Sequence, residues 1–151
     1  MRQSKTGLGL IVIILLLVSG IGIKAQESSL GSISYVRMYA DDSGKTHFKD
    51  ETIKYEDSDV PDFEATPFTK ASSISFTRTA ATLDTDWHPA PRRQWVLILS
   101  GTLEVEVQDG EIRRFPSGSV FFVEDTSGKG HKTRVVGGKE VLAAWIPVDP
   151  E

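Results

Sequence analysis

Short strand-sized runs separated by glycine-containing turns restrict the fold more than any other feature of this sequence. From residue 34 onward, β-branched and aromatic residues alternate with polar ones, and turns such as Asp109-Gly110 and Pro116-Ser-Gly118 interrupt them. No window after residue 26 shows a 3.6-residue hydrophobic period, so no long helix is expected. The pattern predicts an all-β sandwich or barrel. We expect strands at 34–40, 46–55, 72–81, 94–100, 102–107, 111–115, 119–124, 132–136 and 140–147.

Two of these stretches show how a barrel core would form. In the stretch 102–107, Leu103, Val105 and Val107 point to one face and polar residues point to the other, as in a half-buried strand. The stretch 94–99 is apolar on both faces apart from its first residue, as in a central strand. By contrast, the acidic stretch 57–66 is irregular and contains a proline, and it is expected to be a surface loop.

The first 25 residues do not fit this pattern and are expected to lie outside the fold. A basic start is followed by an uncharged run, 7–23, and by Ala25, which is the order of regions in a secretory signal peptide. Cleavage after Ala25 would leave a polar spacer, 26–33, and one domain, 34–151. The alternative is an uncleaved membrane anchor, although 17 residues are short for a span. Either alternative places the domain outside the cytoplasm, as a periplasmic, secreted or membrane-anchored protein.

Charge and cysteine content exclude several classes of function. The chain has 17 Lys and Arg and 21 Asp and Glu, and loss of residues 1–25 would remove three basic residues and no acid. The exported part would then carry a formal charge of −7, so neither nucleic acid nor an anionic membrane surface is an expected partner. Contact with a membrane is expected only through the N-terminal segment. The absence of Cys excludes a thiol nucleophile, a disulfide framework and a Cys-based zinc site.

Two of the three histidines are candidates for a common site. His88 comes shortly before the expected central strand, and His131 begins another strand after a Gly128-Lys-Gly130 turn. Histidines at strand starts in neighbouring loops of a small barrel can converge on one mouth, and imidazole is the commonest metal ligand. The alternative is that each is a surface histidine satisfied by water or backbone.

These residues also carry a resemblance to a known family, because residues 88–136 resemble a small cupin domain. The first cupin motif has two histidines one residue apart, then a glutamate, then a glycine before a hairpin. His88 stands at the first histidine, Ala90 at the second, Gln94 at the glutamate and Gly101 at the glycine. The spacing of the first motif is therefore preserved, but two of its three metal-binding residues are replaced.

The second cupin motif follows at a plausible distance. Pro116-Ser-Gly118 opens the expected strand 119–124, and Gly128 to His131 supplies the turn and the histidine. The resemblance implies a single-domain jelly-roll barrel, a double-stranded β-helix, of the kind found in small bacterial cupins. It also implies a homodimer. Phe121 and Phe122 are adjacent, so one must face outward, where a second subunit often covers an aromatic side chain.

The departures from the cupin pattern leave the metal question open. A typical cupin site resembles three histidines and a glutamate around iron, manganese, nickel, zinc or copper. Carried over, only His88 and His131 remain, and Gln94 offers a single neutral oxygen. His47 and Asp125 could replace the missing ligands. One divalent transition metal and no metal at all are both compatible with the sequence.

Arg92 is a further candidate for the pocket. It is two residues before Gln94 and shares its strand face, whereas Arg93 points the other way. The forked donors of Arg92 could hold an anionic or carbonyl-bearing ligand. The alternative is a structural salt bridge to a nearby carboxylate.

Three functions from different classes are compatible with these observations. The chain could bind a small molecule in its barrel through His88, Arg92, Gln94 and His131, without redox chemistry. It could be a metal-dependent oxygenase or isomerase that uses His88 and His131. It could also be a membrane-tethered interaction module. No catalytic residue is identifiable from the sequence, and whether the chain is an enzyme stays open.

Overall fold

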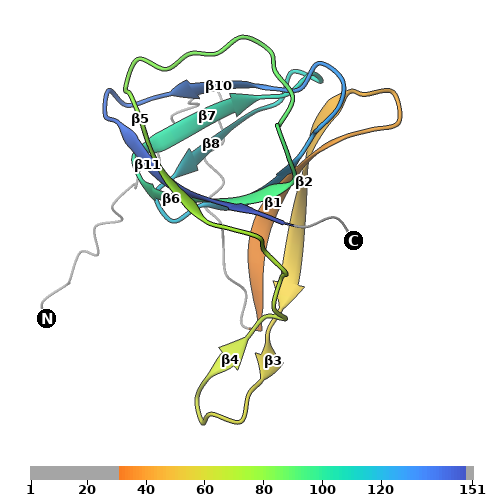
Figure 1. The fold of residues 1–151 in the computed structure, drawn as a ribbon, viewed down its shortest axis with the longest axis vertical. Helices are drawn as coiled ribbons and strands as arrows, with labels where there is room; N and C mark the ends of the chain where they lie inside the picture. The colour runs from red at the N-terminus through yellow and green to blue at the C-terminus, as the bar shows by residue number, and fades with distance from the viewer. Residues whose placement is uncertain (1–30, 149–151) are drawn as a thin grey trace, which may run out of the picture.

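The computed structural model describes residues 31–148, which form an all-β barrel (Figure 1). All nine expected strands are present, with bounds within three residues of those predicted, and the predicted all-β jelly-roll architecture is confirmed. The strands are β1 (Ser32–Ala40), β2 (Thr46–Lys54), β3 (Glu56–Asp57), β4 (Glu64–Ala65), β5 (Ser75–Thr79), β6 (Gln94–Ser100), β7 (Thr102–Glu106), β8 (Ile112–Pro116), β9 (Val120–Glu124), β10 (Lys132–Val135) and β11 (Val141–Pro147).

Two sheets make the walls of the barrel. The larger sheet has the strand order β2-β1-β9-β6-β11-β5, and the smaller has the order β10-β7-β8. Within the larger sheet, β1 and β9 run parallel and the other neighbours run antiparallel. Isolated bridges from Asp84 to Arg134 and from His88 to His131 join the loop between β5 and β6 to β10 and its approach. This loop therefore closes one side of the barrel.

The core fills the space between the two sheets. On β7, Leu103 and Val105 face inward and are almost fully buried, as the alternation predicts. On the larger sheet, Val96 and Ile98 of β6 are equally buried, and Phe121 of β9 stacks on Phe115 with ring centroids 4.2 Å apart. The residues of this core are Met38, Phe48, Ala90, Val96, Ile98, Leu103, Val105, Val107, Phe115, Phe121, Val123, Val141 and Ala143.

The expectation of a plain surface loop at 57–66 is wrong. β3 and β4 pair in this stretch and form a small hairpin, which projects from the barrel beyond the ends of β1 and β2 (Figure 1). Its turn is closed by a hydrogen bond from the Phe63 N–H to the Val60 carbonyl, with Pro61 and Asp62 at the two central positions. Asp62 has a φ of 59°, as the second central residue of a type II turn requires. We call residues 55–65 the arm.

Two sequence-based expectations lie at the edge of the described part or outside it. The signal peptide or anchor at 1–25 falls wholly outside residues 31–148. β1 begins at Ser32, within the stretch 26–33 that was expected to be a spacer. Residues 31–148 contain no helix that is long and apolar enough to cross a bilayer.

Candidate functional site

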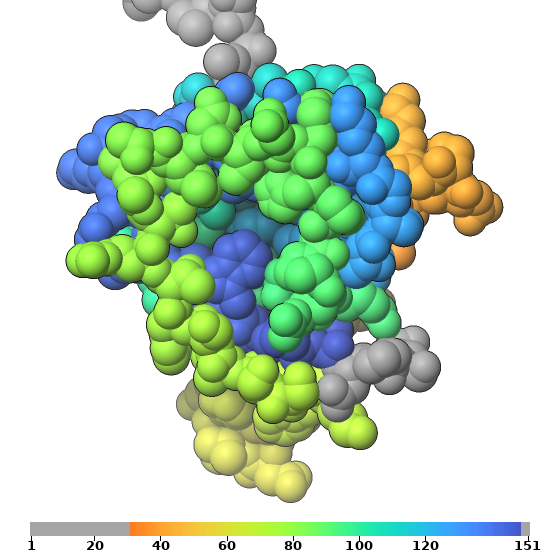
Figure 2. Space-filling view, turned by 45° about the horizontal axis from the view of Figure 1, so that its top comes forward, coloured from red at the N-terminus to blue at the C-terminus, as the bar shows by residue number. Residues whose placement is uncertain are grey.

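A cavity of about 610 Å³ occupies the barrel and opens between the loop before β6 and the edge of β5. Figure 2 shows this opening as a hollow framed by the segment between β5 and β6 and by the turn before β10, with β11 at its base. The cavity falls in the size range of small-molecule sites. It is lined by Met38, Ser73, Ser75, Thr79, Leu83, Thr85, His88, Ala90, Pro91, Arg92, Gln94, Leu103, Val105, Phe121, Val123, His131, Thr133, Trp145 and Pro147.

His88 and His131 are brought together at the wall of this cavity. Each backbone N–H donates to the other residue's carbonyl, with both N···O distances at 3.0 Å. The two imidazole rings are consequently neighbours, with centroids 4.6 Å apart and planes at 53°. The structure thus places the two histidines as the sequence predicted, on one wall of the cavity.

The hydrogen bonds at the Nδ1 atoms determine which ring nitrogens remain available. His88 Nδ1 lies 2.9 Å from the Asp86 carbonyl oxygen, which can only accept, so Nδ1 must carry the hydrogen. His131 Nδ1 lies 2.7 Å from the Asp125 carboxylate, which likewise accepts. Neither Nε2 atom has a protein partner among the described residues. In its neutral form each ring therefore presents an Nε2 lone pair, which can accept a hydrogen bond or bind a cation.

Asp125 lies behind His131 and not in the cavity. Its side chain is fully buried, and Oδ2 accepts from His131 Nδ1 and more weakly, at 3.4 Å, from the Thr46 hydroxyl. The other oxygen, Oδ1, is buried without a partner among residues 31–148. Sequence reasoning proposed Asp125 as a substitute metal ligand, but the geometry makes it a group that orients the His131 ring.

Gln94 and Arg92 also face the cavity, and each has unused hydrogen-bonding groups. Gln94 is only 6% exposed, yet its side-chain amide has no hydrogen bond within the described part of the chain. Arg92 is exposed at the mouth and likewise has no ion pair there. It is Arg93, on the opposite strand face, that bonds to Glu124 at 3.1 Å. The alternation predicted from the sequence is thus present, and the salt bridge considered for Arg92 is made by Arg93.

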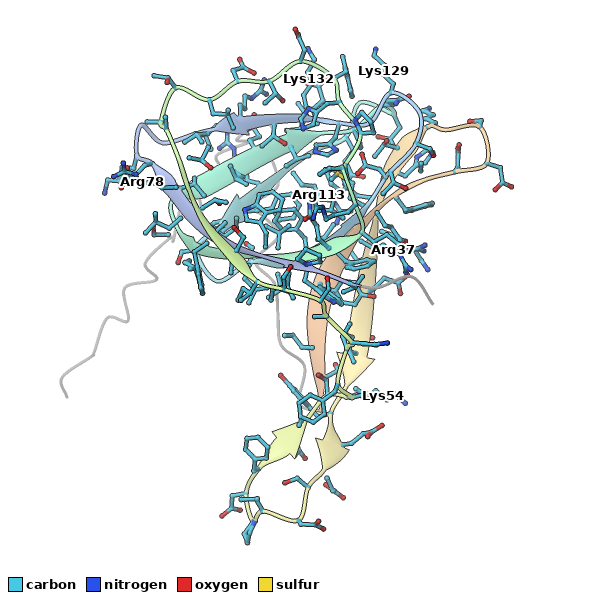
Figure 3. The ribbon with its side chains drawn as sticks, viewed as in Figure 1. Arg37, Lys54, Arg78, Arg113, Lys129 and Lys132 are labelled. Atoms are coloured by element: carbon cyan, nitrogen blue, oxygen red, sulfur yellow. The ribbon has the colours of Figure 1, made fainter. Side chains whose placement is uncertain are left out.

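Two lysines lie against Trp87, the residue before His88. Lys129 Nζ lies 4.5 Å from the centroid of the Trp87 ring, and Lys132 Nζ lies 5.4 Å from it. Figure 3 shows both lysines at the same end of the barrel. Lys and Trp arranged in this way attract each other through the ring quadrupole. Neither lysine lines the cavity, so Arg92 is the basic residue that faces it.

Part of the cavity wall was not recognisable from the sequence. Trp145 lines the cavity, and its Nε1–H donates to the Thr77 hydroxyl at 2.7 Å. The small polar residues Ser73, Ser75 and Thr79 line the same side. Because alternate residues of β5 point to the same side, the sequence could have suggested that Ser75 and Thr79 face the barrel interior. The long connection from β5 to β6 hid the fact that this edge strand borders the mouth.

His47 does not join the other two histidines. Its Nδ1 lies 2.8 Å from Asp109 and its Nε2 lies 3.0 Å from Asp41, so both ring nitrogens are engaged outside the cavity. Hydrogen bonds to Asp41 and then to Asp109 raise the pKa of His47. The pKa of Asp41 is lowered far below its usual range, first by the Ser43 hydroxyl and the Lys45 N–H and then by His47. This cluster joins the β1–β2 turn to the β7–β8 turn.

The cavity offers a small donor set for a metal ion. The described residues contain no group of three or more His, Cys, Asp or Glu side chains placed to hold one. The available donors are His88 Nε2, His131 Nε2 and the neutral oxygen of Gln94. Such a set suits a divalent transition metal that keeps open positions for water or substrate. Its affinity should be lower than that of a site with a carboxylate.

Comparisons with known proteins add little to this description. No protein-family model and no curated protein matches the chain. Among solved structures, protein NMB1881 from Neisseria meningitidis is 13% identical, with 58% of this chain and 90% of that chain covered and a TM-score of 0.41. The Cnp3 cupin domain of Schizosaccharomyces pombe is 17% identical, with 79% and 85% covered and a TM-score of 0.41. Because both TM-scores are low, the barrel is described from its own strand pairing.

Proposed function

We propose that this chain is an exported protein that binds a small molecule inside its barrel. The observation that carries the proposal is the pair of imidazoles, His88 and His131, each presenting an unused Nε2 to a cavity of about 610 Å³. The side-chain amide of Gln94, which has no hydrogen bond among the described residues, faces the same cavity. Polar groups that converge on one largely apolar cavity are typical of small-molecule sites, so these three groups favour a bound partner.

The chemistry of the wall defines what that molecule should carry. Two Nε2 lone pairs in one place call for hydrogen-bond donors, such as a hydroxyl or an amine, or for a cation. Arg92 at the mouth suits a carboxylate or another anionic group. The side chains of Met38, Leu103 and Phe121 suit an apolar body. The ligand class is therefore a small amphipathic acid with a hydroxyl or amino group.

The test is native mass spectrometry of the untagged chain, followed by thermal-shift screening of small organic acids. Binding of a hydroxy or amino acid should raise the melting temperature, and Gln94→Leu with Arg92→Gln should remove the shift. Arg78→Gln is the matched control, because Arg78 lies on the outward face of β5. A melting temperature that no compound raises, together with an empty cavity in the native spectrum, would overturn the proposal.

A metal-dependent enzyme is the second candidate, and one specific observation favours it. Histidines that bind metals almost always donate the other ring N–H to a carboxylate or a backbone carbonyl. His131 does the first and His88 does the second. A bound divalent metal would supply Lewis acidity at open coordination positions. His88, His131 and Gln94 would hold it, and Arg92 would orient an anionic substrate.

Metal content separates the two candidates. The untagged chain and its His88→Ala/His131→Ala double variant should be compared by elemental mass spectrometry after exposure to iron, manganese, nickel, zinc and copper. About one equivalent of metal that is lost in the double variant would favour the metalloenzyme. Metal content that does not depend on the two histidines would exclude it and leave ligand binding alone.

A further inference from the structure

Large apolar side chains are exposed mainly in one stretch of the chain. Among the described residues, eight large hydrophobic side chains are exposed, and five of them lie between residues 60 and 76. These five are Val60, Phe63, Phe68, Ile74 and Phe76, and Phe68 is fully exposed. Exposed apolar side chains gathered in this way mark interaction sites, whereas single ones need no explanation.

The arm that carries the first two of these residues is a built structure. The Ser58 hydroxyl donates to the Phe63 carbonyl at 2.7 Å and accepts from the Val60 N–H at 3.1 Å. The type II turn closes the same loop. The hydrogen bonds fix the conformation while leaving Val60 and Phe63 exposed, at 59% and 56%. An ordered, projecting hairpin with uncovered apolar side chains is preorganised to bind something.

A second surface of the same chain has the complementary character. On the outer face of the larger sheet, Tyr35, Trp95 and Phe122 form a chain of aromatic contacts, with ring centroids 4.8 and 4.7 Å apart. They line a groove of about 600 Å³. Arg37 and Arg93 border it, and both bond to the single carboxylate of Glu124. We call this surface the aromatic groove.

Charge makes the two surfaces complementary. The arm has five acidic residues and no basic one between positions 55 and 65: Glu56, Asp57, Asp59, Asp62 and Glu64. The aromatic groove is lined by three basic residues, Arg37, Lys70 and Arg93, against two acidic ones, Glu51 and Glu124. An acidic, apolar hairpin fits a basic, aromatic groove. The arm projects away from its own barrel, however, so it is not placed to fill the groove of the same chain (Figure 1).

We propose that the arm of one copy docks in the aromatic groove of a second copy, and that the arm of the second copy docks in the groove of the first. Val60 and Phe63 would pack on Tyr35 and Trp95, which are only partly buried, and the arm carboxylates would face Arg37 and Arg93. A two-fold dimer needs such a self-complementary pair of surfaces, because each contact occurs twice. The cavity is not part of this interface, so the proposal is independent of the ligand.

The absence of cysteine from the chain allows a direct test. Full-length Asp59→Cys and Thr69→Cys variants place one thiol on the arm and one at the edge of the aromatic groove. The two are expressed separately, mixed in mild detergent because of the apolar run at 7–23, and oxidised. A disulfide between the two variants is expected on a non-reducing gel. Lys139→Cys, in the exposed β10–β11 turn, is the matched control and should not cross-link to Asp59→Cys.

A second set of variants tests the chemistry of the contact. Val60→Ser/Phe63→Ser should lower the cross-linking yield about tenfold, whereas Ile112→Ser, an exposed apolar residue on β8, should not change it. Asp62→Lys with Glu64→Lys should also weaken cross-linking by about tenfold, most at low salt. A yield no greater than that of the Lys139→Cys control, or a yield unaffected by both arm variants, would overturn the proposal. Analytical ultracentrifugation that finds only monomers would also overturn the proposal.

Discussion

His88 and His131 hold each other by reciprocal backbone hydrogen bonds, both 3.0 Å long, and this bridge brings their rings to 4.6 Å. The residues are far apart in the chain, one in the long loop before β6 and the other at the approach to β10. The bridge therefore closes the barrel and builds the candidate site in one step. A change that breaks the bridge should affect both stability and ligand binding.

Gly130 is where that bridge can be broken most selectively. A Cβ at this position would lie 2.0 Å from the His88 carbonyl oxygen, and φ is +76°. Gly130→Ala should therefore lower the free energy of unfolding by more than about 2 kcal/mol and separate the two rings. The measurement is urea denaturation, together with the ligand-induced thermal shift.

Gly137→Ala is the matched control for this change. Gly137 has a φ of +83°, but a Cβ there would meet nothing within 4 Å. It should incur only the cost of left-handed backbone, about 1–2 kcal/mol, and retain ligand binding. Equal effects of the two substitutions on binding would show that the bridge does not organise the site.

Asp125→Asn should change the tautomer of His131 without unfolding the protein. The carboxylate now accepts from His131 Nδ1 at 2.7 Å and so keeps Nε2 free of hydrogen. An asparagine can instead turn its NH₂ group toward Nδ1, which would then accept, and the hydrogen would move to Nε2. Nitrogen chemical shifts of the imidazole would report this directly. Affinity for a ligand or metal at Nε2 should fall about 10- to 100-fold.

The control for this prediction is Thr46→Val, which removes only the weaker hydrogen bond to Asp125, at 3.4 Å. It should leave the tautomer of His131 unchanged. An unaltered tautomer in Asp125→Asn as well would mean that the surroundings of the ring, and not the carboxylate, fix its protonation.

The His47 cluster should make stability depend on pH. Because folding raises the pKa of His47, its contribution is fully present below the unfolded value of about 6.5 and is lost as the pH rises through the folded-state pKa. The pKa of Asp109 is lowered although burial opposes this, because the Glu111 N–H and His47 both donate to it. The contribution of the Asp109 carboxylate to stability is therefore lost only as the pH falls through its lowered pKa.

The measurement is the urea midpoint of the chain and of His47→Gln between about pH 5 and pH 9. The two curves should be furthest apart near pH 5 to 6 and converge at higher pH. A gap that stays constant over the range would show that the imidazole is not protonated in the folded protein.

The sequence was sufficient to predict the nine longer strands and the alternation of side chains along them. Period-two alternation correctly puts Phe121 and Phe122 on opposite faces of β9, because successive residues on a strand alternate sides. It could not predict the arm, since its strands are two residues long and leave no period to detect. Nor could it place Asp125 behind His131, because that contact depends on how a loop folds back.

The partners of charged residues were also beyond the sequence. The alternation on β7 correctly turns Glu104 to the outer face, where a solvated side chain would be expected. The residue is nevertheless only 4% exposed, because Arg114 from β8 and Arg134 from β10 both bond to it. Cross-strand register brings the three together, and register is not visible in one strand's sequence.

Glu104→Gln should therefore destabilise the smaller sheet more than any other change of an acid on its outer face. The carboxylate accepts from Arg114 Nε at 2.6 Å and from Arg134, and these bonds lower its pKa although burial raises it. A neutral amide would weaken both bonds, at a cost of about 1–3 kcal/mol after allowance for the partial exposure of the arginines. Glu106→Gln, on the same strand and face, should cost less than about 0.5 kcal/mol.

The effect of Glu104→Gln should also depend on pH. Because the folded-state pKa of Glu104 is lowered, the difference in unfolding free energy between the unchanged protein and the variant should shrink as the pH falls below about 4. Urea midpoints at pH 7 and pH 3.5 would measure both effects, and a difference independent of pH would mean that Glu104 acts through packing and not through its charge.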